Sequence, residues 1–168
     1  TDRFAMFQTY DSHSDPGLHP PRLAALRQTL AARDLNGMLV PRADAHQGEY
    51  VAAHDARLAW LTGFSGSAGF CIVTPDRAGV FIDGRYRVQV KAEVDPAHFT
   101  PVPWPETKPA DWLREALPQG GRIGYDPWLP TRREITDLEK ALAGSGIALI
   151  AKSTNPVDTI WSVQPAAP

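Results

Sequence analysis

The chain has 168 residues, a formal net charge of -2, 43% hydrophobic residues and 21% charged residues. This length suits one domain, and the composition is ordinary for a soluble globular protein. The charge argues against nucleic-acid binding, which needs a basic face. No stretch approaches the ~20 apolar residues of a membrane span, so no membrane partner is expected.

The first half of the chain predicts, in order, a helix, a strand, a short helix and two strands that form a hairpin. Leu23, Leu26 and Leu30 recur at helical spacing and indicate an amphipathic helix. The elements expected in chain order are a helix over 22–34, a strand over 37–40, a short helix capped by Asp55, and hairpin strands over 70–74 and 79–82.

The second half alternates helices and strands. Thr131 and Glu134 have the spacing of a capping box, which predicts a helix start. The expected elements are a helix from 83 or 84, a strand over 98–102, a helix over 110–117, a strand over 122–126, a helix from Thr131 to Leu142, and a strand over 147–151. The sequence therefore predicts a single α/β domain, and the hairpin makes its sheet mixed.

The only cysteine is Cys71, so an intramolecular disulfide is excluded. It lies in an apolar run and is expected to be a small buried hydrophobe rather than a reactive thiol. A single cysteine fits a reducing compartment, and Thr1 to His19 lacks the apolar core of a signal peptide. We expect a cytoplasmic protein.

Gly63 to Gly69 is rich in glycine but fits no catalytic or nucleotide-binding motif. Ser67 stands where a nucleophile elbow needs glycine, and Phe70-Cys71 stand where a P-loop needs lysine and a hydroxyl residue. The segment also precedes a predicted strand, whereas a dinucleotide fingerprint opens a helix. We expect a tight backbone passage that requires small residues.

The histidines do not form a recognisable metal site. No His-Glu-x-x-His pattern is present, and a metal would need more ligands than the local pairs Asp44 with His46 and His54 with Asp55 supply. Structural or surface roles are therefore expected for these pairs. His13 and His19 fall in the predicted flexible lead-in.

Asp83-Gly84-Arg85-Tyr86 lies where a strand is expected to pass into a helix, a place where open α/β sheets often present binding groups. A helix start favours anions, so Arg85 is unfavourable for the helix itself. From the residues alone, Arg85 either pairs with a carboxylate, points into solvent or contacts a partner.

Several linked motifs resemble the first domain of long-type Xaa-Pro aminopeptidases, in the creatinase/prolidase superfamily. The resemblance runs from about Leu23 to Trp161. The matching segments are Asp44-Ala45-His46-Gln47 with Glu49-Tyr50, Gly63 to Gly69, Asp83 to Tyr86, Gly124 to Pro127, and Asn155 to Trp161, in which Pro156 replaces the usual Leu.

The resemblance implies a mixed, roughly six-stranded sheet flanked by helices. It divides the chain into a flexible lead-in over 1–21, the domain over 22–154, and an exit segment over 155–168. The implied partners are the remaining domains of the same polypeptide, a peptide substrate with proline in second position, and a second copy in a homodimer. Arg85 corresponds to a family arginine that reaches the substrate, so it is the one site residue expected here.

The resemblance also places the chemistry elsewhere. In the family, two divalent metals, usually manganese, are held by a later catalytic domain, and their ligands cannot be placed in these 168 residues. We therefore expect no catalytic residue, no metal ligand and no peptidase activity in this chain alone. The alternatives are a chaperone-type or free-standing protein-binding module of the same fold, or the first domain of a creatinase or prolidase; Asp44 to Gln47 favours aminopeptidase P.

Overall fold

A computed structural model describes residues 17–42, 56–66, 68–162 and 164–165. Its centre is a six-stranded sheet in the order β4-β3-β2-β1-β5-β6. The strands are β1 (Gly37–Pro41), β2 (Phe70–Val73), β3 (Ala78–Ile82), β4 (Thr100–Pro103), β5 (Gly121–Tyr125) and β6 (Ile147–Ala151). The predicted mixed, six-stranded α/β fold is confirmed.

The sheet contains one reversed strand among the described residues. β2 is antiparallel to both of its neighbours, β1 and β3, whereas the pairs β3–β4, β1–β5 and β5–β6 are parallel. The predicted hairpin is confirmed, and its turn is closed by a 2.8 Å hydrogen bond that the Thr74 N–H donates to the Arg77 carbonyl. All strands except β2 therefore end at the same edge of the sheet.

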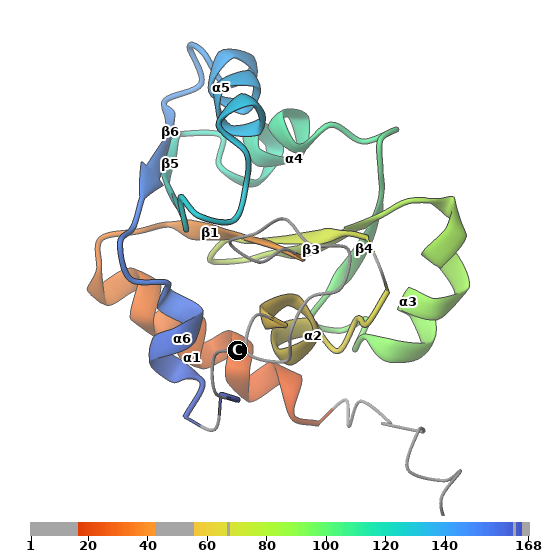
Figure 1. Ribbon diagram of the computed structural model, residues 1–168. Helices are drawn as coiled ribbons and strands as arrows, with labels where there is room; N and C mark the ends of the chain where they lie inside the picture. Colours follow the sequence, from red (N-terminus) through yellow and green to blue (C-terminus); the bar gives the residue numbers. More distant parts are fainter. Residues whose placement is uncertain (1–16, 43–55, 67, 163, 166–168) are drawn as a thin grey trace, which may run out of the picture.

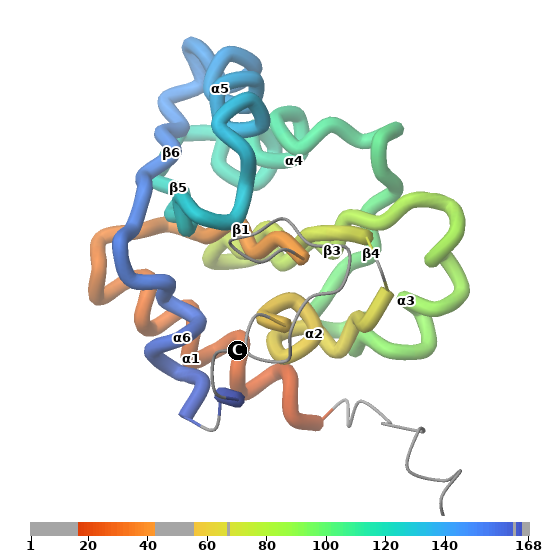
Figure 2. Tube along the Cα trace, in the orientation of Figure 1, coloured from red at the N-terminus to blue at the C-terminus, as the bar shows by residue number. Residues whose placement is uncertain are grey.

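Helices cover both faces of this sheet (Figure 1). The helical elements are α1 (His19–Ala32), α2 (Arg57–Thr62), the 3-10 turn η3 (Gly84–Tyr86), α3 (Arg87–Glu93), α4 (Pro109–Ala116), α5 (Arg132–Ala141) and α6 (Pro156–Ile160). α1, α2, α3 and α6 lie on one side, and α4 and α5 lie on the other. Figure 2 shows the chain crossing from one layer to the other between β6 and α6.

Successive side chains of the central strands enter two separate cores. Cys71 and Val73 belong to the core beneath α1, α2 and α6, whereas Ile72 belongs to the core beneath α4 and α5. This is the period of two expected for a strand that is buried on both faces. Cys71 is buried, as predicted, and this burial raises the pKa of its thiol to about 12.

Two local predictions need correction. α1 begins at His19, not Arg22, because Pro20 and Pro21 suit the first turn, where their missing N–H groups have no helical partner. His19 is 4% exposed and its Nδ1 lies 3.0 Å from the Trp60 carbonyl, so it belongs to the domain rather than to a lead-in. The N-cap of α2 is Ala56; the cap predicted at Asp55 lies outside the described residues.

The capping box at the start of α5 is confirmed. The Glu134 N–H donates to Thr131 Oγ1 at 3.1 Å, and the Thr131 N–H donates to Glu134 Oε1 at 3.2 Å. Two of the amide groups at the helix start are thereby satisfied, as the spacing of these residues predicts.

The segment assigned to an exit from the domain instead packs into it. Val157 in α6 is completely buried, and Trp161 stacks on Trp60 at a centroid distance of 5.3 Å. Arg57 in α2 donates two hydrogen bonds to Asp158, from Nε to Oδ1 at 2.7 Å and from Nη2 to Oδ2 at 2.8 Å. The packed domain therefore extends through Trp161 rather than ending at Thr154.

We predict that Asp158→Ala lowers the free energy of unfolding by about 1.5–3 kcal/mol, because the Arg57 side chain, 6% exposed, would lose a bidentate partner. Urea unfolding of this chain measures the change. Asp137→Ala is the control, since its 3.9 Å pair with Arg133 is exposed and should cost less than about 0.5 kcal/mol. Equal losses in the two variants would contradict the importance of the Arg57–Asp158 pair.

Candidate functional site

The predicted site segment starts where β3 ends, at the carboxyl edge of the sheet. Asp83 occupies the N-cap of η3, and its Oδ1 accepts a 2.9 Å hydrogen bond from the Arg85 N–H. The turn then passes into α3, whose Val90 is completely buried. The chain therefore projects Arg85 from a short turn that is anchored on both sides.

The guanidinium of Arg85 folds back onto Asp83. Its Nη2 donates to Asp83 Oδ2 at 2.8 Å, and its Nε lies 3.2 Å from both carboxylate oxygens. The Arg85 side chain is nevertheless 71% exposed, and its Cζ lies 5.2 Å from the Tyr86 ring centroid. The sequence left three alternatives for the Arg85 side chain: a carboxylate partner, solvent or an external partner. The structure shows that this side chain is exposed and is held by the carboxylate of Asp83.

This pair changes the acidity of both groups. The side-chain hydrogen bond from Arg85, followed by the backbone hydrogen bond, lowers the pKa of Asp83. The same side-chain hydrogen bond raises the pKa of Arg85. The carboxylate is therefore ionised at neutral pH, and its hold on Arg85 weakens only as the pH falls through the lowered pKa of Asp83.

The glycine-rich passage packs directly against this turn. The rings of Phe64 and Tyr86 meet edge to face at a centroid distance of 5.6 Å. A Cβ at Gly66 would collide with the Phe64 ring and lie 2.9 Å from Cδ1 of Tyr86, so this position needs glycine. The expectation of a tight passage is confirmed, and two motifs distant in sequence form one cluster.

Polar contacts tie the same passage to α3. Ser65 Oγ donates to Glu93 Oε2 at 2.6 Å, and Gln89 Nε2 donates to Ser65 Oγ at 3.3 Å. Sequence reasoning did not single out Glu93 or Gln89, because neither lies within a matching motif. They matter here as the groups that position the loop beside Arg85.

Most of the other candidate residues cannot be compared with this cluster. The pairs Asp44 with His46 and His54 with Asp55, together with His13, lie outside the described residues. His98 is a surface residue whose Nδ1 lies 3.2 Å from Asp95 Oδ2. Across the described ranges, no three His, Cys, Asp or Glu side chains are arranged to hold a metal ion, so these residues do not fit a two-metal centre.

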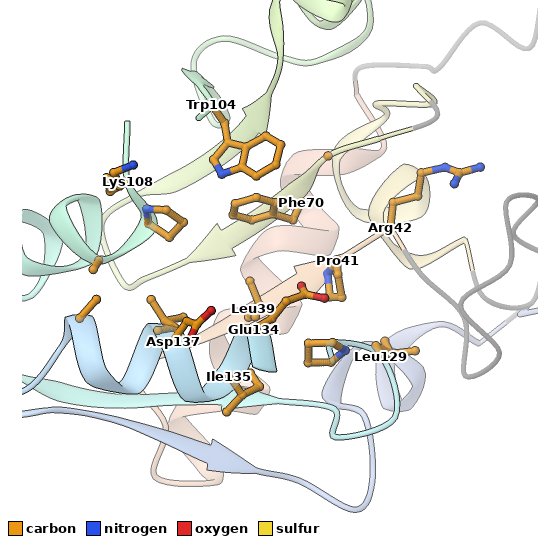
Figure 3. Close-up of a pocket in the computed structure, with 16 residues that line it drawn as sticks. Leu39, Pro41, Arg42, Phe70, Trp104, Lys108, Leu129, Glu134, Ile135 and Asp137 are labelled. Carbon is orange, nitrogen blue, oxygen red and sulfur yellow. The ribbon is translucent and has the colours of Figure 1, made fainter. Parts of the chain in front are cut away.

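A cavity of about 560 Å³ lies at the same edge of the sheet, between α4 and α5 (Figure 3). Its floor includes Leu39 of β1 and Phe70 of β2, and Trp104 forms part of its wall. Sequence reasoning missed it because the lining comes from separate segments that only the folded sheet brings together. Leu39 and Pro41 of β1 and Phe70 of β2 are only half-buried, but their residue types do not distinguish them from the buried residues of the same strands.

The architecture defines a class of protein: an α/β domain with a mixed six-stranded sheet, five strands of which end at the same edge. The creatinase/prolidase N-terminal domain family matches residues 22–160. The chain belongs to that family. Within the described part of the chain, no helix has the length and apolar character to span a bilayer.

The similar proteins of known sequence are larger. Xaa-Pro aminopeptidase 2 from Homo sapiens is 39% identical over 147 residues, which cover 87% of this chain and 22% of that protein. The probable Xaa-Pro aminopeptidase P of Paracoccidioides brasiliensis (strain Pb03) is 37% identical over 142 residues, or 83% and 23% of the two chains. This chain thus spans about a fifth of the length of these relatives.

The similar solved structures agree with the similar sequences. X-prolyl aminopeptidase from Caenorhabditis elegans, described as a cytosolic enzyme with a di-nuclear active site, matches with a TM-score of 0.81 and 32% identity over 88% of this chain and 26% of its own. The N-terminal domain of the cytoplasmic peptidase PepQ from Mycobacterium tuberculosis H37Rv matches with a TM-score of 0.65 and 26% identity, over 83% and 98% of the two chains.

We predict that Gly63→Ala destabilises the domain by about 2–3 kcal/mol, because the residue has φ +84 and its Cβ would lie 2.7 Å from the Glu93 carbonyl. Gly144→Ala is a matched control with φ +79 and no atom within 4 Å, so it should cost only about 1 kcal/mol. Urea unfolding separates the two. Equal costs would show that backbone conformation, and not contact with α3, demands glycine at 63.

Proposed function

We propose that this chain is the amino-terminal, non-catalytic domain of an Xaa-Pro aminopeptidase, an enzyme that removes the first residue of peptides with proline in second position. The observation that carries this is the 39% identity to an Xaa-Pro aminopeptidase of which the chain spans 22%. The same family covers residues 22–160. No step of the hydrolysis is assigned to a residue of this domain.

The metals would belong to another part of the polypeptide. We propose two divalent ions, manganese by analogy with the family, in a catalytic domain beyond this chain. When bound, such ions activate a water and polarise the scissile carbonyl. The present domain would instead form one wall of the cleft that admits short peptides.

Arg85 is the residue proposed to contact substrate. Its side chain is exposed, while its backbone and guanidinium are both held by Asp83, so the cation is presented in a restricted orientation. A planar guanidinium binds carbonyl or carboxylate oxygens with two parallel hydrogen bonds, which lysine cannot do. A substrate oxygen would compete with Asp83 for these donors.

The cellular setting of the complete enzyme is proposed from its similar proteins. A cytoplasmic location agrees with the description of the Caenorhabditis elegans enzyme as cytosolic. A homodimer of the complete enzyme is proposed as well, with this domain contributing contacts between domains or subunits.

We predict that Arg85→Ala in the complete enzyme lowers kcat/KM for an Xaa-Pro peptide by roughly 10–150-fold, the loss expected when a charged hydrogen bond to substrate is removed. Arg87→Ala is the control, because Arg87 is also exposed and lies two residues away at the start of α3. Arg85→Lys should recover only part of the rate. Unchanged kinetics in a folded Arg85→Ala enzyme would remove the substrate role.

A separate experiment tests whether this chain is part of a larger enzyme: the native polypeptide is detected with an antibody against this domain. We expect a product much larger than the 18.4 kDa of this chain, and manganese-dependent hydrolysis of Xaa-Pro peptides by that product. A native product of 18.4 kDa would contradict the proposal and favour a free-standing binding module.

A further inference from the structure

The cavity between α4 and α5 has a preformed aromatic wall. Phe70 stacks on the fully buried Phe81 at a centroid distance of 4.6 Å with the rings 9° apart. Trp104 meets Phe70 edge to face at 5.9 Å. Because Phe81 is fixed in the core, Phe70 is held in place, and the wall offers an apolar surface that exists before any ligand binds.

Prolines make the remaining walls rigid and poor in hydrogen-bond donors. Pro41, Pro109 and Pro130 line the cavity beside Leu39 and Leu138. Proline restricts the backbone and has no N–H group, so these segments cannot easily collapse into the space or donate to a ligand. The volume of about 560 Å³ lies within the range of roughly 300–1,000 Å³ that is usual for small-molecule sites.

Charged groups of opposite sign stand on different sides of this apolar space (Figure 3). Glu134 and Asp137 come from α5. The Asp137 carboxylate points into the opening, whereas the Glu134 carboxylate is turned toward Pro41 and the start of the helix. Lys108 lies on the other side, at the N-cap of α4. Arg42, directly after β1, lines the cavity beyond Pro41, so the carboxylates of α5 lie between Lys108 on one side and Arg42 on the other, around an apolar floor.

The structure orients both charged sides. The capping box at Thr131 holds Glu134 Oε1, which leaves the carboxylate directed along the first turn of α5. On the basic side, α4 starts without a side-chain cap, and its first residues, Pro109 and Ala110, line the cavity. The positive end of this helix dipole adds to Lys108 in attracting an anionic group.

We propose that this cavity binds a small zwitterion with an apolar body, of the class of short apolar peptides. The ammonium group would lie between the carboxylates of α5 and the aromatic wall, where ion pairing and a cation–π contact act together. The carboxylate would lie at Lys108 and the start of α4. This site does not include Arg85, and it stands independently of the proposed function.

The first test is a 1H–15N NMR titration of this chain with the dipeptide Leu-Phe. Saturable binding is expected with a Kd of ~0.1–1 mM, and the shifted amides should cluster around Phe70, Trp104 and Ile135. N-acetyl-Leu-Phe and Leu-Phe-amide should each bind about threefold or more weakly, and Gly-Gly should not bind. Absence of saturation by Leu-Phe, or shifts confined to another surface, would overturn the proposal.

Matched variants test the residues themselves. Glu134→Gln, which keeps the capping oxygen, and Lys108→Met should each weaken binding about threefold, and the two changes together about tenfold. Glu139→Gln is the control on the same helix, because Glu139 is exposed and does not line the cavity. Equal affinity of the double variant and the wild type, with unchanged thermal unfolding, would show that the charged groups do not recognise the peptide termini.

Discussion

Burial of the central strands on both faces is the constraint on which this domain depends. Within β2, Cys71 is completely buried in one core and Ile72 in the other, so neither face of the strand can be left to solvent. Two layers of helices are therefore required, and the chain must supply α4 and α5 on one side and the remaining helices on the other (Figure 1).

The layer beneath the sheet is completed by the last helix. The Arg57–Asp158 pair and the stacking of Trp60 on Trp161 join α2 to the end of the domain, across about a hundred residues of sequence. Arg22 also donates to the Trp60 carbonyl at 2.7 Å, so α1 shares the same junction. The chain at Trp161 is therefore held in a fixed position relative to α1 and α2.

The parallel strands explain why the two candidate binding regions share an edge. β3 is followed by the turn that carries Arg85, and β4 ends at Pro103, directly before Trp104 in the cavity wall. The Trp104 N–H donates to the Ile82 carbonyl at 2.9 Å, which shows that these two strand ends are neighbours. Carboxyl ends of strands in open α/β sheets are the usual location for ligands, and this domain presents both a cation and an apolar cavity there.

Local signals in the sequence determined the strands, most helices and the position of the turn at Arg85, since periodicity and capping act over a few residues. The Thr131–Glu134 capping box is such a case. The boundaries at His19 and Asn155 depended instead on contacts with distant segments: His19 approaches the Trp60 carbonyl, and α6 is anchored by Arg57. The cavity likewise arises only when β1, β2, α4 and α5 converge, because no local pattern encodes a space between elements.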